Sequence, residues 1–432
     1  MTPHPGGEFP ITGGVPLRGR IRLPGCKGIS HRALLFAGIA DGTSRITNLA
    51  PGDDVGRTAS ALTALGVSTN REGDDVEIIG TGFDGIGEPD DVVDCGNSGT
   101  TLRLLAGLLA GRPHLAVLTG DASLRSRPMG RVVRPLRSLG ALIDGAAEAS
   151  RAPLTVRGGG LVGERVELEV ASGQVKTAVV LAGLQAGGVT EIVEPEPSRD
   201  HTERMLAALG APLERVDDRT LRVRAGTPSP FELEVPGDPS SAAFFVVAAA
   251  IVPGSSIVLE RVSLNPGRVG YLDVLRAMGA RIEASVTGEV LGEPFGDITV
   301  ESAPLHGTVI TSREAIVDEL PVLAVAAAFA EGVTEIRGAA ELAVKESNRI
   351  TTLQEELSRL GVEVEARADG LQIHGTTPHG ATMTSHGDHR IAMAAAVAGA
   401  GAQGGTIVAG WDAVAVSYPG FAQDLAQLRG DG

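Results

Sequence analysis

The feature that most constrains the fold of this chain is a short pattern that recurs at intervals of about 70 residues. The pattern reads L-x-x-[LM]-G and ends a segment with the apolar spacing of an amphipathic helix. We expect its glycine to terminate the helix, because a left-handed residue is favoured there and glycine adopts that conformation without strain. The glycines are Gly66, Gly140, Gly210, Gly279 and Gly361, and a degraded sixth copy ends at Arg429.

A second pattern alternates with the first. It consists of an alanine-rich segment that is apolar on every side, then a glycine-containing turn, then a β-branched segment. The helix is expected to be buried, because it has no polar face to present to water, and the β-branched residues predict a strand. The six copies read ALLFAGIADGTSRI, TLRLLAGLLAG, VKTAVVLAGLQAGGVTEI, AAFFVVAAAIVPGSSIVL, LPVLAVAAAFAEGVTEI and IAMAAAVAGAGAQGGTIV.

The alternation of the two patterns predicts a repeated unit of buried helix, strand, surface helix and further strands. Such a unit is longer than a solenoid repeat and suits small α/β units packed into globular domains. The chain has 432 residues, which is more than a single hydrophobic core usually accommodates, so two or more domains are expected. Leucine and glycine are common and could recur by coincidence, but two patterns that alternate regularly argue against this.

Charge and composition narrow the expected partners and location. The net charge is −16, which disfavours general affinity for nucleic acid. The first ten residues, MTPHPGGEFP, lack an apolar signal region, and the longest apolar run, 242–252, is too short to cross a bilayer. Two cysteines, Cys26 and Cys95, suit a reducing compartment. We therefore expect a cytoplasmic protein that binds neither membranes nor nucleic acid.

Polar residues precede each of the six apolar segments. Serine, asparagine and aspartate at such positions are ordinary N-caps, and capping alone would explain any one helix. The residues are Lys27, Ser30, His31 and Arg32; Asn97, Ser98, Gly99 and Thr100; Ser172, Gly173, Gln174 and Lys176; Asp238, Ser240 and Ser241; Asp318 and Glu319; and Asp388, His389 and Arg390.

Capping does not explain the cations in this set, Lys27, Arg32 and Arg390. The helix dipole disfavours positive charge at a helix start, so either these side chains reach solvent or an anion binds them. If the helix starts converge, their free N–H groups and the cations would form a strong anion site.

Other charged residues add candidates for this site. Basic residues cluster at 125–131 and at 345–349, although either cluster could be a solvent-exposed surface. Arg199 is a further basic candidate. Asp318 and Glu346 could act as general acid or base, or simply pair with cations. The sequence contains no HExxH, GxxxxGK[ST] or GxSxG motif, so it indicates no metal, no P-loop and no serine nucleophile. The residues alone predict a two-domain α/β protein that binds a small, multiply anionic, phosphorylated ligand, and they leave its reaction open.

Ten segments in order resemble one family of enzymes. They are LPGCKGISHRALL, GNSGTTLRLLAG, LTGDASLRSRPMGRV, SGQVKTAVVLAG, SRDHTERM, VPGDPSSAAFF, DELPVLAVAAAFAEG, VKESNR, GDHRIAMA and VSYPGF. Through nearly its whole length the chain resembles the 5-enolpyruvylshikimate-3-phosphate synthases. The resemblance implies an α/β fold of two similar domains, each of three βαβαββ units with buried helices, an inside-out α/β barrel. It places residues 1–20 and 235–432 in domain I and 21–234 in domain II, with the active site in a cleft between them that closes on ligands.

The family resemblance also implies a reaction. The enolpyruvyl group of phosphoenolpyruvate is transferred to the 5-hydroxyl of shikimate 3-phosphate, and inorganic phosphate leaves, by addition and elimination through a tetrahedral ketal phosphate. This is a step of the shikimate pathway to the aromatic amino acids, and the family is the target of glyphosate. The expected partners are these two small-molecule substrates, the expected state is a monomer, and no cofactor or metal is expected.

The resemblance assigns site residues at the matching positions. Those implied to bind phosphoenolpyruvate are Lys27, Asn97, Gly99, Arg127, Gln174, Arg349 and Arg390. Those implied to bind shikimate 3-phosphate are Lys27, Gly28, Arg32, Ser172, Gly173, Gln174, Ser198, Arg199, Asp318 and Lys345. Asp318, Glu346 and Lys27 are implied to carry out the proton transfers.

The sequence departs from the family pattern at four positions. Gly28 replaces a serine that helps to hold the shikimate carboxylate, and the loss of such a charged hydrogen bond costs about 1.5–3 kcal/mol, or roughly 10- to 150-fold in affinity. Cys26 replaces an aspartate or serine, Asn348 replaces an aspartate, and Val416 stands where some members have lysine. Gly99 is typical of members that are sensitive to glyphosate, which predicts sensitivity here.

These departures leave alternatives open. The chain could transfer enolpyruvyl to a different acceptor in specialised metabolism, or it could be a non-catalytic binding paralogue. Decay of the site should have removed the charged residues at the matching positions, and they remain. The related UDP-N-acetylglucosamine enolpyruvyl transferases carry a catalytic cysteine after the second buried helix, and residues 111–131 contain none.

Overall fold

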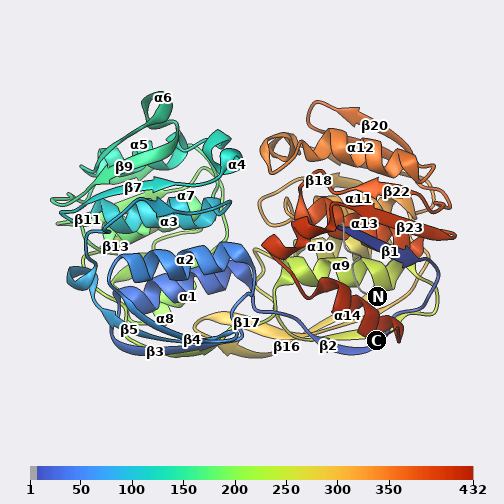
Figure 1. The fold of residues 1–432 in the computed structure, drawn as a ribbon, viewed down its shortest axis with the longest axis horizontal. Coiled ribbons are helices and arrows are strands. Elements are labelled where there is room, and N and C mark those ends of the chain that lie inside the picture. Colours follow the sequence, from blue (N-terminus) through green and yellow to red (C-terminus); the bar gives the residue numbers. More distant parts are fainter. Residues whose placement is uncertain (1–6, 432) are drawn as a thin grey trace. The chain divides into compact units, whose positions relative to one another are not determined.

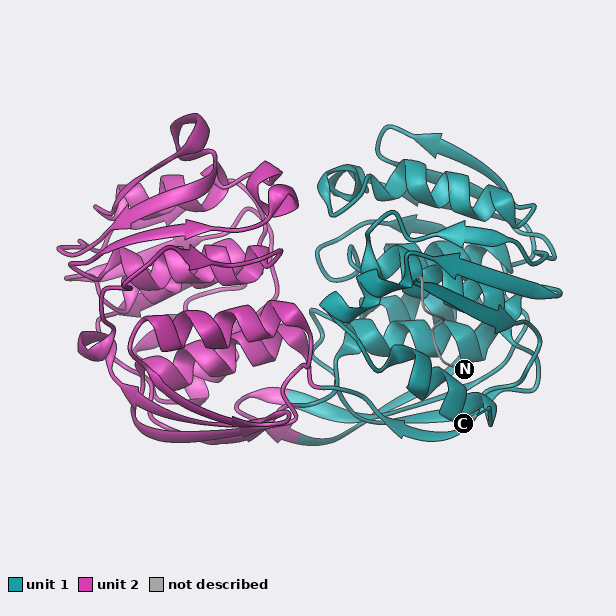
Figure 2. Cartoon of the chain, in the orientation of Figure 1, with its two compact units in different colours: residues 1–24, 236–288, 294–432 teal, residues 25–235, 289–293 magenta. Residues whose placement is uncertain are grey.

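The structure is a computed structural model that describes residues 7–431. Residues 1–6 and 432 of the predicted domain I lie outside this range. The described chain forms two compact units (Figure 2). Unit 1 takes the residues up to Pro24, Pro236–Gly288 and those from Pro294 onward, and unit 2 takes Gly25–Val235 and Glu289–Glu293. The family resemblance implied that the chain crosses between domains near residues 20 and 234, and it did not imply the third crossing, at 289–293.

Unit 2 is built on three four-stranded sheets (Figure 1). In spatial order they are β14 (Glu232–Glu234), β3 (Asp41–Thr47), β5 (Asp75–Thr81) and β4 (Ser68–Glu72); β6 (Val93–Asp94), β7 (Leu115–Thr119), β9 (Arg151–Arg157) and β8 (Leu142–Gly145); and β10 (Arg165–Glu167), β11 (Val189–Val193), β13 (Thr220–Arg224) and β12 (Leu213–Arg215). Its helices are α1 (Lys27–Ile39), α2 (Asp53–Ala64), α3 (Gly99–Ala110), α4 (Ala122–Ser126), α5 (Gly130–Ser138), α6 (Ala146–Ala149), α7 (Gly173–Gly183) and α8 (His201–Ala208).

Unit 1 also has three sheets among its described residues. They are β16 (Arg281–Val290), β17 (Glu293–Glu301), β15 (Ser256–Ser263) and β2 (Arg18–Arg22); β18 (Val309–Thr311), β19 (Val333–Arg337), β21 (Gly370–His374) and β20 (Glu363–Arg367); and β1 (Glu8–Thr12), β23 (Gly405–Ala409) and β22 (Thr382–Thr384). Its helices are α9 (Pro239–Ile251), α10 (Gly270–Ala277), α11 (Leu320–Ala328), α12 (Arg349–Arg359), α13 (His389–Gly401) and α14 (Phe421–Arg429).

One strand topology recurs in these sheets. In the sheet of β10 to β13, β10 lies parallel to β11, and β13 lies antiparallel to both β11 and β12. The chain therefore runs strand, buried helix, strand, surface helix and two antiparallel strands, and the predicted βαβαββ unit is confirmed. In the last sheet the amino-terminal β1 takes the third place, with Glu8 opposite Ala409. Likewise β2 supplies the parallel edge strand beside β15, with Arg18 opposite Ser256.

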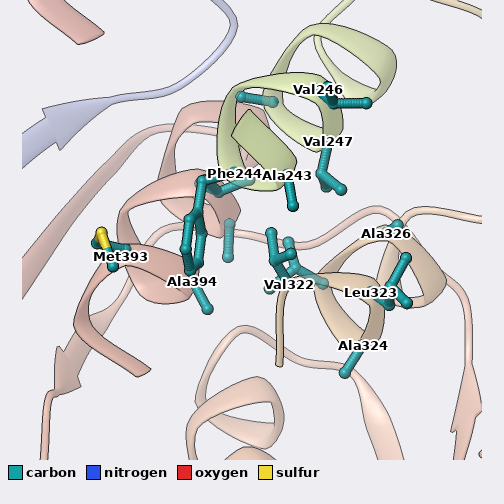
Figure 3. Packing of buried hydrophobic residues seen from close by; sticks show 14 of the residues in the cluster. Ala243, Phe244, Val246, Val247, Val322, Leu323, Ala324, Ala326, Met393 and Ala394 are labelled. Atoms are coloured by element: carbon teal, nitrogen blue, oxygen red, sulfur yellow. The ribbon is translucent and has the colours of Figure 1, made fainter. Parts of the chain in front are cut away.

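Three buried helices fill the centre of each unit. In unit 1, Phe244 of α9, Val322 of α11 and Ala394 of α13 point toward one another (Figure 3). Small side chains let such helices approach closely. In unit 2 a Cβ atom added at Gly107 of α3 would lie 2.2 Å from the carbonyl oxygen of Ala178 in α7. The alanine- and glycine-rich segments are therefore buried, as predicted, and their composition sets the helix spacing.

The predicted helix-terminating glycines adopt the expected conformation. Gly66, Gly140, Gly210, Gly279 and Gly361 all have φ between 74° and 105°. The sixth copy needs a correction, because α14 continues through Arg429 and the left-handed residue is Gly430, with φ of 72°. The glycine of that copy was displaced by one residue rather than lost.

Candidate active site

The starts of the three buried helices of unit 2 lie at one end of the unit. Gln174, in the first turn of α7, donates through Nε2 to Thr100 Oγ1 of α3, at 2.9 Å. Arg32 of α1 donates to the carbonyl oxygen of Gly173 at 3.2 Å and to Thr177 Oγ1 at 2.8 Å. The convergence of helix starts that the sequence suggested is therefore present within this unit.

Arg32 is buried at this end of the unit, with 4 % of the residue exposed. Its Nε donates to Thr202 Oγ1 at 2.7 Å, and its Nη1 donates to the carbonyl oxygen of Gly28 at 2.9 Å. These acceptors, like those in α7, are uncharged oxygens. They orient the guanidinium at the helix starts, which suits a group that binds an anion.

Lys27 pairs with a carboxylate that the sequence analysis did not single out. Its Nζ lies 3.1 Å from Asp54 Oδ2 in the first turn of α2. Behind this pair, His31 Nδ1 lies 2.7 Å from Thr58 Oγ1. Burial lowers the pKa of His31 to about 3, so the imidazole is neutral and supports the helix starts as a hydrogen-bonding group rather than a cation.

The structure brings Arg127 and Asn97 together. Arg127 Nη2 donates to Asn97 Oδ1 at 2.6 Å. Arg125, from the same basic cluster, instead donates to the carbonyl oxygen of Gly120. Sequence reasoning also missed Arg103, whose Nη1 donates to Gln174 Oε1 at 2.6 Å. Its position within TLRLLAG, one turn after Gly99, was the available signal.

Gly99 lies against Arg103 and Arg127. A Cβ atom added there would lie 3.0 Å from Arg103 Nη1 and 3.5 Å from Arg127 Nη1. A larger residue would therefore press on the two guanidinium groups, which gives a physical basis for the sensitivity expected of a glycine at this position.

Ser198 and Arg199 are held beside α7 by a buried ion cluster. Lys176 Nζ lies 2.8 Å from Glu194 Oε2 and 2.7 Å from Glu203 Oε1. Ser198 Oγ donates to the other oxygen of Glu194. Burial raises the pKa of Glu194, against the opposing effect of Lys176. Lys176 is thus a structural cation and not a free helix-start charge.

In unit 1, the candidate site arginines lie against carboxylates. Arg349 is 1 % exposed, its Nε donates to Asp388 Oδ2 at 2.8 Å, and its Nη2 lies 2.7 Å from Glu346 Oε2. Burial alone would lower the pKa of Arg349, but Asp388 and Glu346 outweigh burial and raise it. Asp388 also caps α13 by accepting from the Arg390 backbone N–H, as predicted.

Asp318 lies between two cations of unit 1. Its Oδ1 lies 3.8 Å from Lys345 Nζ, and its Oδ2 lies 3.9 Å from Arg390 Nη2. Arg390 Nη1 also donates to the Asp318 carbonyl oxygen at 2.9 Å. The next residue, Glu319, accepts from Ser240 Oγ at the start of α9. The carboxylate of Asp318 is therefore placed where three helix starts of this unit meet.

The structure divides the predicted site residues between the units. The set in unit 2 is Lys27, Gly28, Arg32, Asn97, Gly99, Arg127, Ser172, Gly173, Gln174, Ser198 and Arg199. The set in unit 1 is Asp318, Lys345, Glu346, Arg349 and Arg390.

Three of the residues that depart from the family pattern lie at helix ends. Asn348 caps α12 by accepting from the Thr351 backbone N–H at 3.4 Å, and the contact between Glu346 and Arg349 on either side of it is intact. Cys26 is fully buried at the start of α1, where no side-chain cap is formed. Val416 ends a short 3-10 helix, Trp411–Val416.

One group of side chains has the spacing of a metal site. Glu355, Glu356 and His386 offer ligand atoms within 4.8 Å of one another. Arg359 lies 2.7 Å from Glu355 Oε1 and 3.4 Å from Glu356 Oε1, and Glu356 also accepts from the Thr384 backbone N–H. These contacts account for the group as an ion-pair network.

Repeated βαβαββ units, with cations and carboxylates at the starts of their buried helices, define an α/β enzyme that acts on small anions. Residues 11–425 match the family model described as EPSP synthase (3-phosphoshikimate 1-carboxyvinyltransferase). The chain therefore belongs to the EPSP synthase family and is a transferase. In the part of the chain that the structure describes, no helix combines the length and the apolar character needed to cross a membrane.

Relatives and solved structures match over almost the whole chain. A 3-phosphoshikimate 1-carboxyvinyltransferase of Roseiflexus castenholzii is 51% identical over 96% of this chain and 97% of its own. That of Bacillus thuringiensis subsp. konkukian is 47% identical over 97% and 98%. The structure of an EPSP synthase from Acinetobacter baumannii covers 98% of both chains, with 40% identity and a TM-score of 0.87.

A more distant structure shows how far the fold extends. The enolpyruvyl transferase NikO from Streptomyces tendae covers 98% of both chains with a TM-score of 0.80, but it is 19% identical. At this level of identity, the likeness shows a shared fold alone.

Proposed function

We propose that the chain transfers the enolpyruvyl group of phosphoenolpyruvate to the 5-hydroxyl of shikimate 3-phosphate and releases inorganic phosphate. The observation that carries this proposal is the position of Asp318. Its carboxylate lies between Lys345 and Arg390, 3.8 and 3.9 Å away, beside the pair of Glu346 and Arg349. A base flanked by cations suits a reaction that moves protons on a polyanionic substrate.

The arginines and the lysine would bind phosphoenolpyruvate through its phosphate and carboxylate. Charge-assisted hydrogen bonds from guanidinium groups to such oxygens are strong and directional. Asn97 and Gln174 hold the guanidinium groups of Arg127 and Arg103. In this proposal the residues that bind phosphoenolpyruvate are Lys27, Asn97, Gly99, Arg127, Gln174, Arg349 and Arg390.

A second group would bind the acceptor. Arg32, Arg199 and the first turn of α7 would hold the shikimate phosphate and carboxylate, because N–H groups at a helix start favour anions. In this proposal the acceptor residues are Lys27, Gly28, Arg32, Ser172, Gly173, Gln174, Ser198, Arg199, Asp318 and Lys345. Gly28 supplies no hydroxyl, so we expect weaker acceptor binding than in members that have serine there.

The reaction needs proton transfer in both directions. In the addition step the acceptor oxygen bonds to C2 of phosphoenolpyruvate, its proton leaves, and C3 gains a proton, which gives the tetrahedral ketal phosphate. In the elimination step C3 loses a proton, the C2–C3 double bond forms again, and the C2–O bond to phosphate breaks. Asp318 and Glu346 would accept and return these protons, with Lys27 as a further donor.

The test is turnover by the purified chain with both substrates. Inorganic phosphate release should require phosphoenolpyruvate and shikimate 3-phosphate together, and mass spectrometry should find the enolpyruvyl ether product. Gly28→Ser should lower the KM for shikimate 3-phosphate. The proposal fails if phosphate release does not depend on shikimate 3-phosphate at saturating concentrations. Deuterium exchange from solvent into C3 of phosphoenolpyruvate across a panel of acceptors would then identify a different acceptor.

We also infer a monomer located in the cytoplasm. The family membership and the small anionic substrates support this inference. Light scattering of the purified chain should give one mass near 44.1 kDa, and a mass twice as large would contradict it.

A further inference from the structure

The turn between β16 and β17 belongs to unit 2, although most of both strands lies in unit 1. Leu291 and Gly292 form a two-residue connection with φ of 48° and 75°, the left-handed pair that suits a tight hairpin. Val290 and Leu291 pack against the hydrophobic core of unit 2. A Cβ atom at Gly292 would lie 3.0 Å from the carbonyl oxygen of Arg204, so the backbone of the turn is seated closely on α8.

The next residue of the hairpin makes a buried contact with the start of α8. Glu293 Oε1 lies 2.8 Å from His201 Nδ1, and each side chain is 1 % exposed. A carboxylate at this depth is stable only with good hydrogen-bonding partners. Arg204 adds a second link, because its Nη1 donates to the Gly292 carbonyl oxygen at 3.1 Å and its Nε lies 2.7 Å from Asp200 Oδ2.

The first turn of α8 joins this contact to the groups assigned to the acceptor. Arg199 lies two residues before His201, and its Cβ lies 3.1 Å from the position that a Cβ at Gly173 would take. On the other side of His201, Thr202 Oγ1 accepts from Arg32 Nε at 2.7 Å. A shift of His201 would therefore move Arg199 and also Thr202, whose hydroxyl oxygen holds the Arg32 guanidinium.

We propose that Glu293 is a positioning residue for the binding of shikimate 3-phosphate. It holds His201, and through the first turn of α8 it sets the positions of Arg199 and Arg32. Glu293 itself is assigned no contact with substrate. This inference rests on the proposed function, since it names what positions that function's acceptor groups.

The inference predicts an effect on one substrate and not the other. A displacement of about 1 Å in a binding group can cost up to about 100-fold. The two arginines positioned by the first turn of α8, Arg199 and Arg32, are assigned to shikimate 3-phosphate only. Glu293→Ala should therefore raise the KM for shikimate 3-phosphate by about 10- to 100-fold and change the KM for phosphoenolpyruvate less than about twofold. A purely structural role would reduce the amount of active enzyme and leave both KM values unchanged.

The conservative variant separates positioning from folding. Glu293→Gln keeps the length of the side chain and an oxygen that accepts from His201 Nδ1–H, so its acceptor KM should return to within about threefold of the parent. His201→Asn and the double variant complete a cycle. If the two residues act as a pair, the double variant should raise the KM no further than Glu293→Ala alone.

Glu331→Gln is the matched control, because Glu331 faces His306 at 3.7 Å with both side chains exposed, 86 % and 62 %.

Direct binding of shikimate 3-phosphate to the full chain, measured by calorimetry, distinguishes the two possible failures. A parent chain that neither binds shikimate 3-phosphate nor turns it over overturns the proposed function, and this inference with it. A parent chain that binds and turns over, with Glu293→Ala showing the parent's KM and affinity for shikimate 3-phosphate, overturns the inference alone. A rise in both KM values by the same factor also overturns it.

Discussion

The two units repeat one topology, but the candidate site arginines of each unit contact different partners. In unit 2, Arg32 and Arg127 donate to hydroxyl, carbonyl and amide oxygens. In unit 1, Arg349 and Arg390 lie against the carboxylates of Asp388, Glu346 and Asp318. Neutral acceptors orient a guanidinium group, whereas carboxylates beside a guanidinium also add groups that can exchange protons. In the proposed function, unit 1 therefore places acid–base groups next to its anion-binding arginines.

The largest expected effect tests the acid–base assignment in unit 1. Asp318→Asn keeps the shape of the side chain but removes its basicity, so kcat should fall by about 10²- to 10⁴-fold. Steady-state kinetics with both substrates measures this. The control is Glu341→Gln, because Glu341 also faces Lys345, at 3.6 Å, but is half exposed. Equal losses in the two variants would mean that Asp318 only balances the charge of Lys345.

The second effect compares the capping residues of the two units. Asp388→Ala removes the cap of α13. It also leaves the buried Arg349 without one of its carboxylate partners, which should lower the free energy of unfolding by about 3–5 kcal/mol. Ser98→Ala removes the cap of α3, where the serine accepts from the Thr101 backbone N–H, and the hydrogen bond from Thr101 Oγ1. It leaves no charge unpaired and should cost about 1–2 kcal/mol. Urea titration of both variants measures the difference, and similar losses would remove the contrast between the units.

The third effect is a difference in acid sensitivity. His31 has a folded-state pKa of about 3, lowered by burial from an ordinary 6.5. As the pH falls, His31 is therefore protonated in the unfolded chain at a higher pH than in the folded chain. Stability should therefore fall as the pH drops below 6.5, by about 2 kcal/mol at pH 5. The pKa of Asp388 is lowered from 3.8, because Arg349 and its neighbours outweigh burial. Its contribution is present above pH 3.8 and is lost only as the pH falls below that value.

Unfolding by urea at pH 7 and pH 5 measures this difference. His31→Asn does not titrate in this range, so the variant should lose about 2 kcal/mol less than the parent between the two pH values. Equal losses in parent and variant would show that His31 is not the acid-sensitive group.

The smallest effect concerns the crowding around Gly99 in unit 2. Gly99→Ala would press on the ends of two flexible arginines, at 3.0 and 3.5 Å, so we expect a change of about 1 kcal/mol, or several-fold, in glyphosate inhibition and in the KM for phosphoenolpyruvate. The parent should be sensitive to glyphosate. Gly56→Ala is the control, since a Cβ there meets nothing within 4 Å. Inhibition unchanged by Gly99→Ala would contradict the assignment.

Features that depend on nearby residues could be predicted from the sequence. The repeated unit, the left-handed glycines and caps such as Asp388 follow from local spacing and backbone preference. Partners far along the chain could not be predicted, because an isolated acidic residue carries no sign of the cation it will meet. Asp54 beside Lys27 and Glu293 beside His201 are of this kind. Arg103 was hidden by its place in a segment that otherwise reads as apolar core.

The pairing of β1 with β23 has a consequence for how the protein is made. Glu8 and Ala409 lie opposite each other, although about 400 residues separate them along the chain. A ribosome that adds about 5–20 residues per second needs roughly 20–80 s to reach the second strand after the first. Throughout this time β1 has no neighbour on the nascent chain and exposes a strand edge. Unit 2 can form most of its core during synthesis, whereas unit 1 is completed only near the end of translation.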